Sequence, residues 1–448
     1  MAGDFPLIAG FGPGRTIGWC AGQPVSAERF CAAARELAAT LPPKSHVLNL
    51  CGDRLNFMLA FAAALIARQV SLLPYSKAPG VVRDLSYSHP DSYCISDTSD
   101  LPSGLPAIMV PPWSAGAGSP DVPQIPGDQV ALVAFTSGST GRPQAHVKTW
   151  ESLVRDGRTL GAALGILPET PCSIAGTVPP QHVYGLETTV MLPLQNGVAT
   201  HSACPLLPAD IAAVLAELPG ERWLATTPIH LRGCVGEKTP FPSVAGIVCA
   251  TMPLAPDLAR QTESAFAAPV HEIYGCTEAG AVALRRTVLT ERWRVRQGMR
   301  LWQKGEETWV DGNHLPHPLR LPDRLELMSP TEFSLLGRPD DMVKIAGKRV
   351  SIEALNRELL RVSGVRDGVF FILAAAEGAE TRIAALVVAP HCEPEIILRA
   401  LRERIDPAFL PRPLLIVDAL PRNATGKLTR EGLLALAASV QPGNERTA

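Results

Sequence analysis

The stretch Phe135-Thr-Ser-Gly-Ser-Thr-Gly-Arg-Pro143 decides how the rest of the chain is interpreted. It follows an apolar run over residues 130–134, typical of a buried strand, and precedes residues 150–164, whose spacing predicts a helix. Its two glycines allow positive φ angles and the close approach of a ligand. Backbone amides and hydroxyls near a helix N-terminus suit a polyphosphate. The expected phosphate-binding residues are Thr136, Ser137, Gly138, Ser139, Thr140 and Gly141.

Three further motifs follow this loop. A Ser/Thr/Gly loop alone is more often an ordinary surface turn, and this one lacks the Gly-Lys-Ser/Thr of a P-loop. Downstream lie Tyr274-Gly-Cys-Thr-Glu278, the run from Gly337 to Val350, and Pro421-Arg-Asn-Ala-Thr-Gly-Lys427. In this order the four motifs resemble those of the adenylate-forming superfamily, which includes acyl- and aryl-CoA synthetases, luciferases and the adenylation domains of peptide synthetases. Each motif is weak singly, but the four together are specific.

Length and composition indicate a globular enzyme of two or more domains. The chain has 448 residues, of which 46% are hydrophobic and 19% charged. Lys plus Arg number 41 and Asp plus Glu 43, a balance that predicts neither a nucleic-acid partner nor attraction to an anionic membrane. The longest apolar run, residues 57–67, is shorter than the ~20 residues of a membrane span. The ten cysteines form no C-x-x-C pair or Cys/His cluster. We therefore expect a cytoplasmic protein without stable membrane insertion.

The order of predicted elements defines the fold class. Strands and helices alternate over residues 15–95 and 173–266, which predicts an α/β fold with helix-covered, mostly parallel sheets. Helices are expected over residues 186–196, 256–266 and 352–360, and Ser26 is expected to cap a helix that runs to Leu41. Residues 281–336 read as short strands of a β subdomain, and fresh patterning beyond residue 341 predicts a small, mobile α+β domain. We expect an N-terminal adenylation domain over residues 1–337, a hinge at 338–340 and a C-terminal lid domain over 341–448.

The resemblance implies activation of a small-molecule carboxylic acid with ATP. A carboxylate is a poor electrophile, and its attack on the α-phosphate gives an acyl-adenylate and pyrophosphate. Bringing two negative groups together requires a cation and preorganised donors. By the resemblance, Lys427 is the catalytic cation, and Glu278 and Thr140 bind Mg²⁺.

The resemblance also assigns the nucleotide and acid pockets. Adenine and ribose would be bound by Tyr274, which stacks on the base, with Thr277, Asp323 and Arg338. His182 would lie beside the substrate carboxylate as a second catalytic residue, although a lone histidine is usually structural. The rest of the substrate pocket would be formed by Tyr184, Gly185, Ala250, Thr251, Met252 and Gly275.

A second half-reaction is implied by the run from Gly337 to Val350. Asp340 matches the position about which the C-terminal domain rotates in the family. The rotation would exchange Lys427 for the loop around Gly347, which lines a tunnel for phosphopantetheine. The acyl group would then form a thioester on CoA or on an acyl carrier protein.

The chain departs from the family pattern at two places. The usual Pro-Lys-Gly after the phosphate loop is Pro143-Gln144-Ala145, so one charge is lost, and either Lys148 or His146 is available to replace it. The usual Thr-Gly before the ribose aspartate is Leu321-Pro322. Shortness and the run Gln144 to Trp150 resemble the compact aryl-acid ligases of aryl-polyene and xanthomonadin-type pigment pathways, which implies an aromatic acid such as 4-hydroxybenzoate.

Three alternatives remain open from the sequence. One is a ligase for fatty or medium-chain acids. Another is amino-acid adenylation, which usually needs an acidic residue near His182, and none lies between Thr177 and Leu186. The third, suggested by Gln144, is a nucleotide-binding protein whose catalysis has degenerated; the joint presence of Glu278, Asp340 and Lys427 argues against it.

Overall fold

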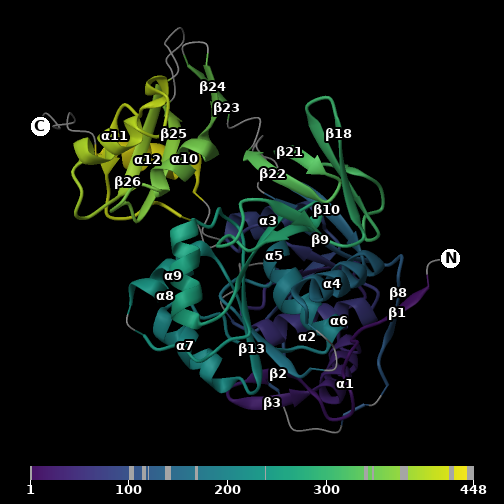
Figure 1. Ribbon diagram of the computed structural model, residues 1–448. Coiled ribbons are helices and arrows are strands. Elements are labelled where there is room, and N and C mark those ends of the chain that lie inside the picture. Colours follow the sequence, from purple (N-terminus) through teal and green to yellow (C-terminus); the bar gives the residue numbers. More distant parts are fainter. Residues whose placement is uncertain are drawn as a thin grey trace, which may run out of the picture.

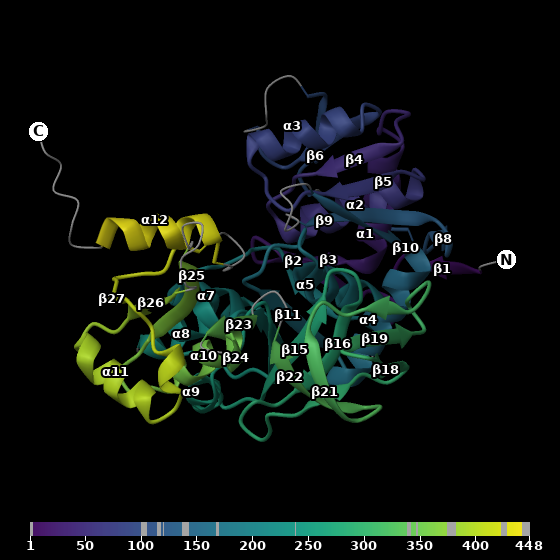
Figure 2. The same cartoon turned by 90° about the horizontal axis from the view of Figure 1, so that it is seen from above.

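The computed structural model describes residues 3–99, 105–113, 118–119, 121–136, 143–166, 170–237, 239–337, 342–345, 348–373, 382–422 and 428–440. A large body contains the N-terminal and middle parts of the chain, and a smaller C-terminal part lies beside it (Figure 1). Seen from above, α3 covers the sheet that contains β4, β5 and β6 (Figure 2). In the part of the chain that is described, no helix has the length and apolarity needed to cross a membrane.

The first sheet of the body has six strands in the order β10-β9-β5-β4-β6-β7. Neighbouring strands are parallel except β10, which runs antiparallel to β9 at one edge. The alternation predicted for residues 15–95 is thus confirmed as parallel-sheet structure. The elements are β4 (His46–Asn49), β5 (Val70–Leu73), β6 (Ser92–Ser96), β7 (Ala107–Met109), β9 (Val130–Thr136), β10 (Gln144–Thr149), α1 (Ala27–Ala38), α2 (Arg54–Ile66) and α3 (Pro79–Ser88).

The second sheet has eleven strands, and its centre is parallel in the order β15-β14-β13-β11-β12-β2. The helix predicted over residues 186–196 is instead two short α-helices joined by a π-helical segment, Glu187–Met191. The elements are β2 (Thr16–Cys20), β3 (Gln23–Ser26), β11 (Cys172–Gly176), β12 (Ala199–His201), β13 (Glu221–Thr226), β14 (Gly246–Cys249), β15 (Val270–Cys276), α4 (Trp150–Leu164), α5 (Val183–Leu186), α6 (Leu192–Asn196), α7 (Pro208–Glu217), α8 (Pro228–Gly236) and α9 (Pro256–Phe266).

The strands predicted for residues 281–336 are present and form a β-rich region with its own hydrophobic cluster, and some of them also continue the second sheet. β16 (Gly280–Arg285), β17 (Trp293–Val295), β21 (Arg324–Ser329) and β22 (Glu332–Gly337) extend the second sheet with antiparallel pairs. A three-stranded sheet of its own contains β18 (Met299–Lys304), β19 (Glu307–Gly312) and β20 (Leu319–Arg320). Far from this region, β1 (Asp4–Pro6) pairs with β8 (Gln124–Pro126).

One local prediction about the phosphate loop is wrong. The loop was expected to run from a strand directly towards the helix at residues 150–164, but β10 intervenes, so the loop connects two antiparallel strands. Thr136 pairs with Gln144 in the ladder, which fixes where the loop begins and ends. The N-terminus of α4 lies at the far end of β10 and is capped by Thr149, whose hydroxyl accepts from the Ser152 amide at 3.3 Å. The length of β10 therefore separates the N-terminus of α4 from Gln144.

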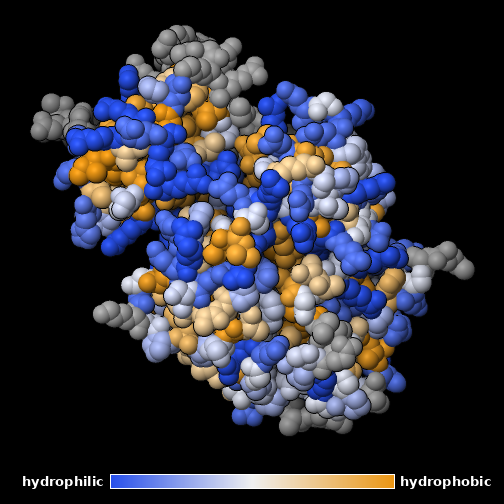
Figure 3. Space-filling model, viewed as in Figure 1, coloured by the Kyte–Doolittle hydropathy of each residue, from blue (hydrophilic) through white to orange (hydrophobic). Residues whose placement is uncertain are grey.

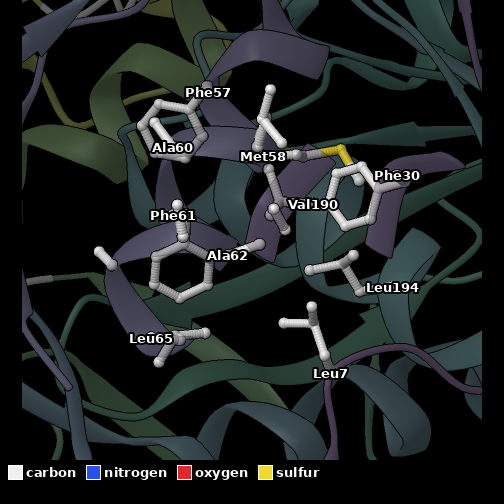
Figure 4. Packing of buried hydrophobic residues seen from close by; sticks show 14 of the residues in the cluster. Leu7, Phe30, Phe57, Met58, Ala60, Phe61, Ala62, Leu65, Val190 and Leu194 are labelled. Carbon is white, nitrogen blue, oxygen red and sulfur yellow. The ribbon is translucent and has the colours of Figure 1, made fainter. Parts of the chain in front are cut away.

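Helix α2 lies between the two sheets and forms the centre of the largest core. It contacts β4 and β5 of the first sheet and β2 and β12 of the second. This position explains why the helix is apolar on every side. Figure 4 shows its side chains packed against others from α1, from the segment 183–196 and from the N-terminal residues. The labelled residues are Leu7, Phe30, Phe57, Met58, Ala60, Phe61, Ala62, Leu65, Val190 and Leu194.

The first residue of α2 is a fully buried arginine. The guanidinium of Arg54 is 0% exposed and donates to five acceptors at 2.7–3.0 Å, all in the segments that follow β11 and β12 or end those strands. Asp53 caps the same helix end by accepting from the amides of Leu55 and Asn56. Arg54 thereby ties the helix of the first sheet to the second. The acceptors are the carbonyl oxygens of Gly176, Val178, His201 and Ala203 and the sulfur of Cys204.

The C-terminal part has two hydrophobic clusters of its own, formed by residues from 343 onwards. Its predicted α+β pattern is confirmed, with helix α10 over the predicted residues. The domain boundary at residue 337 and the hinge stay predictions, because residues 338–341 lie outside the described ones. The elements are β23 (Met342–Ile345), β24 (Lys348–Ser351), α10 (Ile352–Leu360), β25 (Asp367–Leu373), β26 (Arg382–Val388), α11 (Pro394–Arg402), β27 (Leu414–Ile416) and α12 (Arg430–Val440).

Replacing Arg54 by methionine should lower the melting temperature by at least about 5 °C. Four carbonyl oxygens lose their donor, each buried unsatisfied group costs ~1–3 kcal/mol, and ~1 kcal/mol shifts a domain of this size by ~2–4 °C. Differential scanning calorimetry measures the shift. The matched control is Arg300→Met, because Arg300 is 71% exposed and pairs with Asp311 at the surface. Equal shifts in the two variants would show that Arg54 is dispensable.

Candidate functional site

The candidate residues gather at one edge of the second sheet. β11, β13, β14 and β15 are parallel neighbours, so their carboxyl ends meet at the same edge. His182 and Tyr184 follow β11, Ala250, Thr251 and Met252 follow β14, and Thr277 with Glu278 follows β15. Ligands of open α/β sheets bind at such an edge. Strand order thus brings together three of the segments singled out in the sequence.

The predicted phosphate and lid residues are only partly described. Thr136 ends β9, whereas Ser137, Gly138, Ser139, Thr140 and Gly141 lie outside the described residues. The same holds for four residues of the later motifs: Arg338, Asp340, Gly347 and Lys427. The segment around Lys427 is bounded by Arg422 and Leu428, which form an isolated antiparallel bridge.

Side chains from other segments hold the turn that carries Glu278 at three of its residues, Glu278, Ala279 and Ala281. Lys148 on β10 donates its ammonium to the carbonyl oxygen of Glu278. The ring nitrogen Nε2 of His314 lies 2.9 Å from the carbonyl oxygen of Ala279, and the amide of Ala281 donates to Oε2 of Glu187 at 3.1 Å. The turn between β15 and β16 therefore has little freedom to move.

The side chains beneath this turn form a buried charged cluster that sequence reasoning missed. Asp156 of α4 pairs with Arg296, whose side chain is fully buried, and His314 lies 3.8 Å away. Burial disfavours the ionised carboxylate of Asp156, but Arg296 and His314 outweigh it and lower its pKa. Burial and the Asp156 charge raise the pKa of Glu187 well above its ordinary value. The surroundings therefore shift the pKa values of the two carboxyl groups in opposite directions.

His146 lies between the phosphate loop and the Glu278 turn. Its Nε2 is 3.2 Å from the hydroxyl oxygen of Thr136 and 3.7 Å from Oε1 of Glu278. Burial lowers the pKa of the His146 imidazole, and the nearby Glu278 carboxylate opposes this shift. Lys148, the other residue considered as a replacement for the missing lysine, is 9% exposed and committed to the Glu278 carbonyl.

The predicted adenine and ribose residues meet. The hydroxyl of Tyr274 donates to Oδ2 of Asp323 at 2.9 Å, across segments that are far apart in the chain. The Tyr274 ring is 7% exposed and packs against Trp293 and Phe333, with ring centroids 5.7 and 5.4 Å away. These contacts fix the ring and orient the Asp323 carboxylate. Stacking of Tyr274 on adenine stays a prediction.

Tyr184, one of the residues predicted to line the acid pocket, is held by two backbone carbonyl groups. Its hydroxyl reaches the carbonyl oxygens of Thr226 and Val248 at 3.0 and 2.8 Å, which ties α5 to the ends of β13 and β14. Burial raises its pKa well above the ordinary value, so the phenol stays neutral. Gly185 is required here, since a Cβ would lie 2.1 Å from the Pro179 carbonyl oxygen. His182 is half-buried at the start of α5.

The segment after β14 is strained. Thr251 has φ +79°, a value that β-branched residues rarely adopt, and its buried hydroxyl has no hydrogen-bond partner among the described residues. Ala250 is buried beside it. Across the edge, exposed Gly275 lies at a bulge where a Cβ would meet the Gly280 carbonyl oxygen at 2.2 Å. A strained backbone and an orphaned hydroxyl are typical of a ligand pocket.

The C-terminal part reaches this edge through Arg422. Arg422 forms a bidentate ion pair with Asp367 of β25 at 3.0 and 2.8 Å, and its Nη1 lies 3.1 Å from the sulfur of Met252. Arg232 of α8 binds the same Asp367 at 3.0 Å, so one carboxylate joins the two parts. In the space-filling view, hydrophilic residues border the junction between the C-terminal part and the body (Figure 3).

The donor set at Glu278 fits a magnesium ion shared with a nucleotide. Within the described ranges no group of three or more His, Cys, Asp or Glu side chains could hold a metal alone. Glu278 offers one carboxylate, 38% exposed at the sheet edge. Mg²⁺ keeps several waters and is commonly held by one or two carboxylates together with substrate phosphates.

Comparisons with known proteins agree with this geometry. The sequence profile described as "AMP-binding enzyme" matches residues 40–304. The 4-coumarate–CoA ligase of Halorhodospira halophila is 30% identical over 312 residues, covering 66% of this chain and 74% of that protein. The p-hydroxybenzoic acid–AMP ligase of Mycobacterium tuberculosis (strain CDC 1551 / Oshkosh) is 25% identical over 348 residues, covering 68% of this chain and 49% of that protein.

A solved structure shows the same fold over nearly the whole chain. The o-succinylbenzoate–CoA synthetase of Bacillus subtilis, in complex with its acyl-adenylate intermediate, superposes with a TM-score of 0.80. The match covers 96% of this chain and 98% of that one at 17% identity. The family profile assigns the chain to its family, and the structural similarity agrees with that assignment in fold. It belongs to the AMP-binding enzyme family of the adenylate-forming superfamily and is an enzyme of the acid–thiol or acyl-AMP ligase type.

Proposed function

We propose that this enzyme uses ATP and Mg²⁺ to convert an aromatic carboxylic acid into an acyl-adenylate and then into a thioester on CoA or a carrier protein. The observation that carries the proposal is the meeting of Thr136 and Glu278 at His146. It places the first residue of the phosphate loop and the expected metal-binding carboxylate at one point. The Tyr274–Asp323 hydrogen bond supports the proposal further, because it joins the residue before β21 that is expected to bind the ribose to the hairpin that carries Glu278.

The chemistry proceeds in two displacements. A carboxylate oxygen of the acid attacks the α-phosphorus of ATP, the bond to the pyrophosphate oxygen breaks, and an acyl-adenylate forms. A thiolate then attacks the acyl carbon and expels AMP. Lys427 stabilises the charge that develops in the first step. Glu278 would hold Mg²⁺ together with the phosphates, and the ion would help to neutralise the leaving pyrophosphate.

An aromatic acid is the favoured substrate class, with 4-hydroxybenzoate the best single candidate. Two relatives carry names for 4-coumarate and p-hydroxybenzoic acid. The amino-acid alternative needs a carboxylate for the α-ammonium group, and the nearest one after His182 is Glu187. The Glu187 side chain is 5% exposed and accepts a hydrogen bond from the amide of Ala281. It therefore faces the turn between β15 and β16, which it supports.

Acid-dependent exchange of labelled pyrophosphate into ATP tests the proposal. Assayed against benzoates, cinnamates, fatty acids and amino acids, the enzyme should respond most strongly to hydroxylated aromatic acids. If fatty acids or amino acids supported the strongest exchange, that class of acid would replace aromatic acids as the proposed substrate. No exchange with any acid, while ATP still binds, would favour a nucleotide-binding protein without catalysis.

Lys427→Ala should reduce exchange by about 10²-fold or more, the usual effect of removing one group that stabilises transition-state charge. ATP affinity, measured by isothermal titration calorimetry, should stay nearly unchanged because the phosphate loop is intact. Lys304→Ala, at an exposed position of β18, is the control and should behave as the wild type. Undiminished exchange in Lys427→Ala would remove this lysine from the mechanism.

Gly347→Leu should leave pyrophosphate exchange within about twofold of the wild type and slow thioester formation at least about tenfold, since an isobutyl group blocks a narrow tunnel. Thioester formation is followed by mass spectrometry with CoA and with a phosphopantetheinyl carrier protein. Gly80→Leu, in a place where an added Cβ meets open space, controls for the added bulk. An equal loss of both half-reactions would contradict the tunnel.

A further inference from the structure

One face of the edge strand β10 carries a row of polar side chains that run from the surface into the core. Residues two apart on a strand share a face, so Gln144, His146 and Lys148 point to the same side. Along this row the residues change from exposed through half-buried to buried. Pairing with β9 places Gln144 beside Thr136, at the start of the phosphate loop.

Two of these side chains approach different atoms of the same residue, Glu278. Lys148 binds the carbonyl oxygen of Glu278, and His146 lies 3.7 Å from its carboxylate. The imidazole is also 3.2 Å from the Thr136 hydroxyl. The His146 side chain is 13% exposed while that of Glu278 is 38% exposed, so the imidazole supports the carboxylate from the protein side and leaves its outer face open.

We propose that His146 is a positioning residue for the binding of magnesium nucleotide. It holds the Glu278 carboxylate and the Thr136 hydroxyl in one fixed relation before the ligand arrives. A carboxylate on a turn loses less conformational freedom on binding a cation if a neighbour already orients it. This inference rests on the proposed function, because it takes Glu278 as the ligand of the metal.

Lys148 does not fill this role. Its ammonium is buried and committed to the Glu278 carbonyl, so it fixes the backbone of the turn but not the direction of the carboxylate. Gln144 at the exposed end carries no charge. Of the three side chains in the row, that of His146 lies beside both the Glu278 carboxylate and the Thr136 hydroxyl.

Calorimetric titration of ATP, with saturating Mg²⁺ and separately with EDTA, distinguishes this role from a purely structural one. His146→Ala should weaken ATP binding about tenfold in Mg²⁺ and change it by less than about twofold in EDTA. Its melting temperature without nucleotide should stay within about 2 °C of the wild type. His146→Gln keeps a side-chain N–H donor in nearly the same place and should recover most of the loss.

His201→Ala is the matched control. His201 also pairs with a glutamate, Glu217, with Nε2 and Oε2 3.0 Å apart, but on β12 and α7 away from the phosphate loop. It should lower the melting temperature and leave the effect of Mg²⁺ on ATP affinity unchanged. Unaltered Mg²⁺ dependence in His146→Ala, or an equal loss with and without Mg²⁺, overturns the positioning role.

The exchange assay separates failure of this inference from failure of the proposed function. If the wild type catalyses acid-dependent exchange and His146→Ala keeps normal Mg²⁺ dependence, the function stands and the inference falls. If wild-type ATP binding is indifferent to Mg²⁺ and no acid supports exchange, both fall together.

Discussion

The guanidinium group of Arg54 is the constraint on which the arrangement of the two sheets depends. It is the first residue of a helix packed on one sheet, and its acceptors belong to the strand ends of the other. A buried charge is costly unless it is hydrogen-bonded, and the two terminal nitrogens of Arg54 reach five acceptors, so the helix and these strand ends tolerate few relative positions. The end of β11 leads into the segment of His182 and Tyr184, which is predicted to line the acid pocket. A contact within the core thus sets the geometry of the ligand edge.

The buried cluster beneath the Glu278 turn acts in a similar way at shorter range. Asp156, Glu187, Arg296 and Lys148 come from four different segments and place two carboxyl groups, whose pKa values are shifted in opposite directions, in van der Waals reach of the turn. A buried polar network of this kind restricts the turn, because a change of position would separate charged groups from their partners. The π-helical segment begins at Glu187, and such segments often occur at functional sites because they redirect a side chain.

The sequence predicted regular elements best where caps and periodicity agreed. The helices at 150–164, 256–266 and 352–360 match to the residue, and Ser26 caps α1 by accepting from the Arg29 amide. β10 was overlooked because its alternation, with Ala145 and Val147 between polar residues, lasts only six residues and runs into a helix. The helix over residues 186–196 was predicted whole because an apolar pattern cannot show a change of hydrogen-bond register.

The sequence motifs predicted the residues of the site, but they did not predict which side chains contact one another. The Tyr274–Asp323 bond joins two predicted residues, but the buried cluster joins residues that share no motif, and no local pattern predicts a tertiary ion pair. One signal was available: Glu187 is an acidic residue within an otherwise apolar or uncharged stretch, and Asp156 lies among the buried residues of α4. The positive φ angle of Thr251 had no sequence signal, since glycine is the residue expected in that conformation.

The sharing of Asp367 by two arginines has a consequence for the effect of salt on the molecule. Arg232 belongs to the body and Arg422 to the C-terminal part, and both draw on one counter-ion. Any movement that carries residues 367 and 422 away together leaves Arg232, 21% exposed, to be compensated by solvent ions alone. Dissolved salt lowers that cost by screening. Ionic strength is therefore a physical variable that shifts the balance between joined and separated parts.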